Sequence, residues 1–136
     1  MTWRNLCSAA VVNNEDSLFV KIDIEGAEFD VVPDVLESHR QITSLVIEVH
    51  DLDTRFSEFL SLHEQIAAHF VLVHTHCNNY SRWVPSIGCT SAVELTYLHR
   101  SLLHDASTAA LAKGGYCRVD LDRPCNPENP ECRLRF

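Results

Sequence analysis

The sequence predicts an α/β domain, with a partial sheet of parallel strands plus a final antiparallel strand, flanked by helices. Apolar runs with strand character alternate with runs of helical period in the order strand, helix, strand, helix, strand, strand. The last two strands have no helix between them, so they must be antiparallel. A chain of 136 residues with 46% hydrophobic and 22% charged residues has the size and composition of one globular domain.

The amino-terminal elements follow from spacing and turn residues. Apolar positions at helical spacing predict a helix over residues 3–12, and the polar cluster 13–17 predicts a turn. Strand formers predict the first strand over residues 18–24, after which Gly26 permits a tight turn. Residues 27–39 carry one apolar face and predict a helix that Pro33 kinks or restarts.

The later elements are predicted in the same way. Residues 45–49 form the second strand, 57–70 a helix, and 70–74 or slightly more the third strand. A loop rich in Asn, Ser and Pro spans 75–88, and the alternating run 91–98 is the fourth strand. We assign residues 1–100 to the α/β domain. Residues 101–136 are expected to form a short helix at 102–113 and an extended tail with three prolines.

Charge and hydropathy restrict the partners. The chain has 19 acidic and 11 basic residues and a net charge of -8, without a basic face, so nucleic acid is not expected to bind. No apolar run reaches the length of a signal peptide core or a membrane span. The six cysteines include no CxxC pair, and we expect free thiols in a reducing compartment, which favours the cytoplasm. The alternative is a small loop closed by Cys125 and Cys132.

One segment carries a family resemblance. The string FVKIDIEGAEFDVV is followed by LVIEVH, HTHCNNY and AVELTYLHR, and together they resemble the second half of an FkbM-type methyltransferase. The family pattern K-I-D-x-E-G-x-E is matched by Lys21, Ile22, Asp23, Glu25, Gly26 and Glu28. The resemblance implies a Rossmann-like class I sheet and transfer of a methyl group from S-adenosylmethionine to an oxygen of a small molecule or glycan.

The chain also departs from that family. A class I methyltransferase binds its cofactor through a glycine-rich turn, whereas only four glycines occur here and none forms a GxG after a strand. We therefore expect the cofactor-binding half to be missing, either in a fragment or in a degenerate relative, and catalysis by this chain alone is not expected. The sheet should be half of the usual one, ordered fourth, fifth, seventh, sixth strand. Its first strand would then be an exposed edge that favours self-association.

Four side chains are the predicted catalytic and cofactor-binding residues. Asp23 and Glu25 follow the first strand, and Glu48 and His50 end the second, so in a parallel pair they should cluster at one sheet edge. The resemblance implies that this edge faces the transferred methyl group. Asp23 and Glu25 would lie at the cofactor, and Asp23, Glu48 or His50 could take the acceptor proton. Alternatively, these groups only solvate the strand ends, and Glu25 and Glu28 favour the helix start.

A second set of polar residues follows the third strand. His74 and His76 share one strand face, and with Cys77 they could ligate a metal. The sequence places no convincing second ligand pair, so we predict no metal site and a substrate-binding role instead. That role is assigned to His74, His76, Asn78, Asn79 and Tyr80, whose polar groups suit a polyhydroxylated acceptor. The alternative function for the whole chain is a non-catalytic interaction module.

Overall fold

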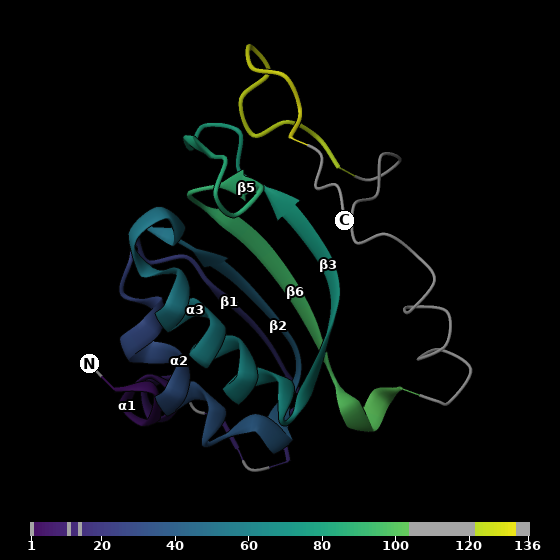
Figure 1. Ribbon diagram of the computed structural model, residues 1–136. Coiled ribbons are helices and arrows are strands. Elements are labelled where there is room, and N and C mark those ends of the chain that lie inside the picture. The colour runs from purple at the N-terminus through teal and green to yellow at the C-terminus, as the bar shows by residue number, and fades with distance from the viewer. Residues whose placement is uncertain (1, 11, 14, 104–121, 133–136) are drawn as a thin grey trace.

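The chain forms an α/β structure, as the sequence predicts. The computed structural model describes residues 2–10, 12, 13, 15–103 and 122–132 (Figure 1). Its helices are α1 (Trp3–Ala9), α2 (Glu28–Leu36) and α3 (Leu52–Ala67), with 3-10 turns η1 (His39–Gln41) and η2 (Arg100–Leu102). Its strands are β1 (Leu18–Ile22), β2 (Ile42–Val49), β3 (Phe70–Cys77), β4 (Trp83–Val84), β5 (Cys89–Thr90) and β6 (Val93–His99).

The main sheet has four strands in the order β1-β2-β6-β3. This is the order that the sequence predicts for a half sheet. β1 and β2 are parallel, and β6 is antiparallel to both β2 and β3. The two strands that α3 connects are therefore not neighbours, because β6 returns from β3 and lies between them. The sheet is mixed, with a single parallel pair among the described strands.

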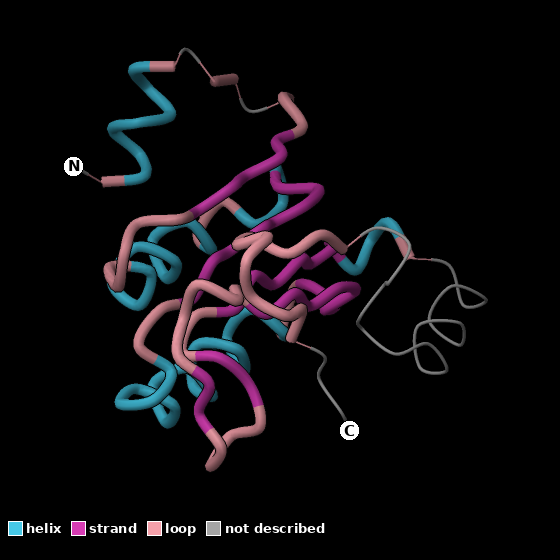
Figure 2. The backbone as a smooth tube through the Cα atoms, turned by 90° about the horizontal axis from the view of Figure 1, so that it is seen from above, coloured by secondary structure: helices cyan, strands magenta, loops and turns pink. Residues whose placement is uncertain are grey.

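Helices α2 and α3 cover one face of the sheet, while α1 lies against α2 (Figures 1 and 2). Alternate strand residues point toward these helices, as the two-residue period of a strand requires. The buried core on this side includes Val20, Ile22, Val32, Val35, Ile42, Leu45, Ile47, Val49, Leu62, Ile66, Phe70, Leu95 and Tyr97. The buried Tyr97 hydroxyl lies 2.9 Å from Nδ1 of His63 on α3, so its polar end is satisfied.

Several predicted boundaries are wrong. α1 ends at Ala9, and β1 ends at Ile22 rather than at residue 24. α3 begins at Leu52 rather than at residue 57, because the Asp51 carbonyl accepts hydrogen bonds from the amides of Thr54 and Arg55 and so starts the first turn. The predicted loop 75–88 contains the end of β3 and also β4, which pairs with β5 in a small hairpin.

Other expectations concern the second helix and the carboxy-terminal part. α2 ends at Leu36 rather than at residue 39 and runs through Pro33 as one helix, so of the predicted kink or restart the restart does not occur. Residues 122–132 contain turns but no helix or strand. The helix predicted at 102–113 lies outside the described residues except for the end of η2. Free thiols are confirmed at Cys7, Cys89, Cys125 and Cys132. None of the described helices has the length and apolar character needed to cross a membrane.

Candidate functional site

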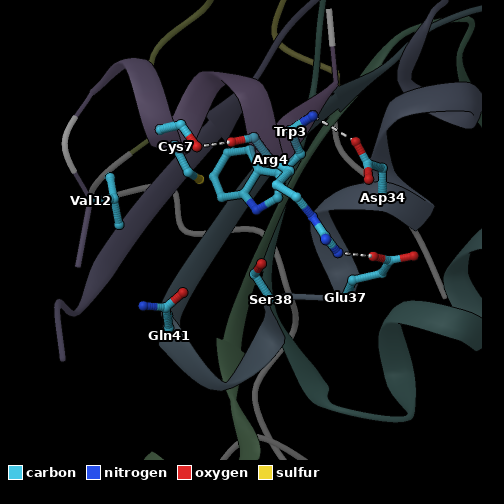
Figure 3. A pocket seen from close by; sticks show the side chains of 9 residues that line it. Trp3, Arg4, Cys7, Val12, Asp34, Glu37, Ser38 and Gln41 are labelled. Carbon is cyan, nitrogen blue, oxygen red and sulfur yellow. Dashed lines mark hydrogen bonds and ion pairs between the residues drawn. The ribbon is translucent and has the colours of Figure 1, made fainter. Parts of the chain in front are cut away.

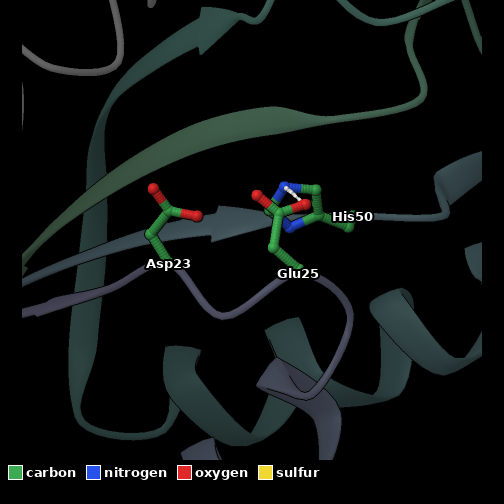
Figure 4. A group of neighbouring side chains, drawn as sticks. All are labelled: Asp23, Glu25 and His50. Atoms are coloured by element: carbon green, nitrogen blue, oxygen red, sulfur yellow. Dashed lines mark ion pairs between the residues drawn. The ribbon is translucent and has the colours of Figure 1, made fainter.

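The predicted clustering at the strand ends is confirmed. Asp23 and Glu25 follow β1, and His50 follows β2, so the parallel pairing brings them to one edge of the sheet (Figure 4). One ligating atom from each of these three side chains lies within 4.8 Å of the other two. The Nε2 atom of His50 is 3.5 Å from Oε2 of Glu25 and 3.8 Å from Oε1 of Glu48. All four predicted residues therefore belong to one cluster.

The turn after β1 has a backbone that most residues avoid. Glu25 has a φ of 53° and Gly26 a φ of 101°, and Asp51 at the end of β2 has a φ of 57°. Only Gly26 of these three lacks a Cβ, and a Cβ there would lie 3.0 Å from Oδ2 of Asp51. The glycine thus permits the turn to pass close to Asp51, which precedes α3.

Arg55 fixes the same turn from the side of α3. Its Nη1 donates a hydrogen bond of 2.9 Å to the Gly26 carbonyl, and its guanidinium lies 3.9 Å from the centre of the Phe29 ring. The guanidinium also pairs with Glu58 at 2.7 Å. The turn between β1 and α2 is therefore tied to the first turns of α3.

Glu28 is the buried support of the cluster. Its side chain is fully buried at the start of α2, and Oε1 accepts hydrogen bonds of 3.2 Å from the amides of Ile24 and Gly26. The same oxygen lies 3.0 Å from Nδ1 of His50. The sequence indicated only a helix-start role for Glu28. The sequence held one signal for the contact with His50. Glu28 is a carboxylate two residues after the turn glycine, and the following strand ends just before His50.

The charges of this pair are coupled. Burial works to raise the pKa of Glu28, but hydrogen bonds from backbone amides and from His50 outweigh it and hold the pKa below its usual value. Burial works to lower the pKa of His50, but the carboxylates of Glu28, Glu48 and Glu25 outweigh it and raise the pKa. Each group thus favours the charged form of the other at neutral pH.

Glu48 lies on the opposite face of β2 from the apolar core. It stands directly across from Glu94 on β6, and like charges in such a pair repel. Neighbours compensate, since Asn78 donates a hydrogen bond of 2.6 Å to Glu48, and Lys21 lies 3.6 Å from Glu94. Asn78 is the one predicted substrate residue that the structure ties directly to the catalytic candidates.

The other predicted substrate residues contact the tail or solvent. His74 pairs with Asp122 at 2.8 Å, and His76 lies 3.1 Å from Glu131 and 3.5 Å from Glu94. The two imidazoles therefore pair with different carboxylates, His74 with Asp122 and His76 with Glu131 and Glu94. Tyr80 is exposed.

Asn79 holds the tail against the loop after β3. Its Nδ2 donates to the carbonyls of Asn126 and Asn129, and its Oδ1 accepts a hydrogen bond of 2.6 Å from the Asn126 amide. The Asn129 side chain returns a hydrogen bond to the Asn79 carbonyl. The side chain of Asn79 is buried. Its observed contacts are thus structural, and the sequence did not indicate them.

The hollows in the described part of the chain lie away from the cluster. One, of about 340 Å³, opens between α1 and the end of α2, where the backbone amide of Trp3 donates to the Asp34 carboxylate and Arg4 pairs with Glu37 (Figure 3). Another, of about 280 Å³, is apolar and lies between α3 and the strands β3 and β6. Neither is lined by Asp23, Glu25 or His50. The exposed carboxylates of Asp23 and Glu25 can accept hydrogen bonds from a cofactor, and with His50 they can hold a metal.

Comparison of the chain with models of protein families, with curated proteins and with solved structures gives no match.

Proposed function

We propose that this chain provides the acceptor-side half of an S-adenosylmethionine-dependent O-methyltransferase of the FkbM type. The observation that carries the proposal is the K-I-D-x-E-G-x-E string at residues 21–28, which coincides with a turn that presents Asp23 and Glu25 beside His50. The strand order β1-β2-β6-β3 supports the proposal, since it is the order expected for the second half of such a sheet. Catalysis by the chain alone is not part of the proposal.

Each residue of the cluster has a role in this proposal. Asp23 and Glu25 are exposed acceptors at the carboxyl end of β1, where open α/β sheets bind ligands, and they would hold the cofactor. The bound cofactor supplies the electrophilic methyl group. His50, oriented by Glu28, is the general base that takes the proton of an acceptor hydroxyl. Asn78 and Glu48 would orient that acceptor, a small molecule or a glycan.

Calorimetric titration of the folded chain with S-adenosylhomocysteine tests the proposal. We expect no micromolar binding by this chain, because the glycine-rich turn that holds the cofactor in the family is missing from the sequence. Glu64→Gln removes an exposed carboxylate from the far part of α3 and serves as the control. Micromolar binding at one site per chain, weakened by Asp23→Asn but not by Glu64→Gln, would contradict the proposal, because this chain would then build a cofactor pocket by itself.

A second function is an interaction module without catalysis. The unpaired side of β1, an outermost strand of the described sheet, favours it. Within the described residues β1 pairs with β2 on one side only, and Phe19 on β1 is 67% exposed. An edge strand with an exposed aromatic residue is a template for pairing with another chain. In this alternative, two copies of the chain associate through their β1 edges.

Sedimentation velocity tests this alternative. The module predicts a dimer for the wild-type chain and a monomer for Phe19→Lys, because a charged side chain at the edge opposes strand pairing. Lys21 already lies on the same strand face, so the substitution introduces no new kind of side chain there. A wild-type chain that remains monomeric at high concentration would eliminate the module.

A further inference from the structure

We propose that Asp23, Glu25 and His50 form a binding site for a divalent transition-metal cation. The site takes two carboxylate oxygens and one imidazole nitrogen, all at the carboxyl edge of the parallel pair β1 and β2 (Figure 4). It is separate from His74 and His76, for which the sequence predicts no metal site. Cation binding does not require methyl transfer or self-association.

The spacing of the three side chains suits one shared ion. Two ligands that each lie about 2.1 Å from a tetrahedral ion are about 3.4 Å apart. Nε2 of His50 and Oε2 of Glu25 are 3.5 Å apart, and the third ligand atom, from Asp23, lies within 4.8 Å of both. Asp23 and Glu25 are exposed and can close the remaining distance by side-chain rotation alone.

The partner of His50 on its other side points to the same conclusion. Glu28 lies 3.0 Å from Nδ1 and accepts its N–H, so the other ring nitrogen, Nε2, is the one that faces the carboxylates of Glu25 and Glu48. Without a metal, a proton on Nε2 pairs with these carboxylates, and a bound cation would take the place of that proton. Metal-bound histidines commonly donate their second ring N–H to a carboxylate, which fixes the ring and raises its basicity.

Glu28 supports the proposed imidazole ligand from the side opposite the ion. It is a fully buried carboxylate, and its Oε2 has no hydrogen-bond partner among the described residues. Buried charges are normally paired or linked to a metal. A cation on Nε2 of His50 would polarise the imidazole and strengthen its hydrogen bond to Glu28.

The donor set selects the class of ion. Imidazole favours transition metals over Ca²⁺ and Mg²⁺, while two carboxylates and the absence of a thiolate suit Mn²⁺, Fe²⁺ and Zn²⁺. Three protein ligands leave coordination positions for water or for an oxygen atom of another molecule. Glu48 lies 3.8 Å from Nε2 and already accepts from Asn78, so it belongs to the surroundings of the ion.

Electron paramagnetic resonance of Mn²⁺ added to the chelator-treated full chain tests the site. We expect one bound ion per chain, and both Asp23→Asn and Glu25→Gln should weaken binding by about tenfold or more. Both side chains are exposed, so these variants should fold, which circular dichroism checks. Glu64→Gln, which removes an exposed carboxylate on α3, should leave the affinity unchanged.

Glu28→Gln distinguishes an ion on His50 from one held by carboxylates alone. Glu28 touches the far nitrogen of His50 and also accepts from the amides of Ile24 and Gly26, so His50→Gln is measured beside it, and both variants should weaken Mn²⁺ binding about tenfold if the imidazole is a ligand. Absence of Mn²⁺ binding, or binding that Asp23→Asn and Glu25→Gln leave unchanged, would overturn the proposal. Binding that survives Glu28→Gln at full strength in a folded chain would remove His50 from the ligand set and so overturn the site as stated.

Discussion

Glu28 at the start of α2 and His50 at the end of β2 are joined by a 3.0 Å contact between Oε1 and Nδ1. The carboxylate is fully buried, and the imidazole is directed by it toward the exposed carboxylates of Asp23 and Glu25. This contact couples the fold to the candidate site, because the same Glu28 oxygen also accepts from the two turn amides after β1. The first prediction follows from that double role.

Replacement of Glu28 should destabilise the protein. Glu28→Ala leaves the amides of Ile24 and Gly26 without their acceptor and His50 without its counter-charge, so we expect a loss of about 3 kcal/mol in the free energy of unfolding. Glu28→Gln keeps one acceptor oxygen and should cost about half as much. Urea unfolding followed by circular dichroism measures both. Equal stability of Glu28→Ala and wild type would show that the buried contacts contribute nothing net.

The two described glycines with positive φ provide a matched comparison. Gly26→Ala should cost about 2 kcal/mol, because alanine is strained at a φ of 101° and its Cβ would approach Asp51. Gly88→Ala has a φ of 69° and no atom within 4 Å of the added Cβ, so only the left-handed strain of about 1 kcal/mol applies. Thermal or urea unfolding gives the difference. A larger cost at Gly88 would contradict the close approach at the turn.

Removal of Asn79 should release the tail. Asn79→Ala eliminates the hydrogen bonds to Asn126 and Asn129 that hold residues 122–132 against the loop after β3. A glutamyl endopeptidase should then cut after Glu128 about tenfold faster. The tail can open for cleavage in the variant without first breaking those hydrogen bonds. Mass spectrometry locates the cut. Tyr80→Ala is the control, because Tyr80 is the exposed neighbour, and it should be cut at the wild-type rate.

Acid should destabilise the protein through a histidine cluster at the opposite end of the sheet. The His39 ring stacks on His69 with 3.6 Å between ring centres, and its Nδ1 lies 3.2 Å from Nε2 of His99. Burial, followed by the charges of His69 and His99, lowers the pKa of His39, and burial also lowers the pKa of His99. Protonation therefore favours the unfolded chain, and stability present above about pH 6.5 is lost as the pH falls.

The His39→Gln variant isolates this effect. Its free energy of unfolding should fall less steeply than that of wild type between about pH 7 and pH 5. The reason is that the variant lacks one histidine whose pKa is lowered in the folded state. Urea titrations at several pH values give both slopes. The raised pKa of His50 acts in the opposite sense, but it is common to both proteins and cancels in the comparison. Parallel slopes would refute the contribution of the cluster.

Much of the fold could be predicted because its signals are local. The alternation of strand and helix patterns indicated the α/β class, and the lack of a helix before residues 91–98 indicated the antiparallel return of β6. The boundaries were less accurate where hydrogen bonds rather than hydropathy decide them. Asp51 starts α3 through its carbonyl, and the hairpin of β4 and β5 consists of two short strands inside a polar loop.

The sequence by itself determined that Asp23, Glu25, Glu48 and His50 meet at one edge, because parallel strands bring their carboxyl ends together. Only the tertiary structure decided which of them interact. The burial of Glu28 behind His50, the contact of Asn78 with Glu48 and the use of Asn79 to hold the tail all join residues from different elements. Such pairings depend on side-chain direction and packing across the sheet, which no periodicity along the chain records.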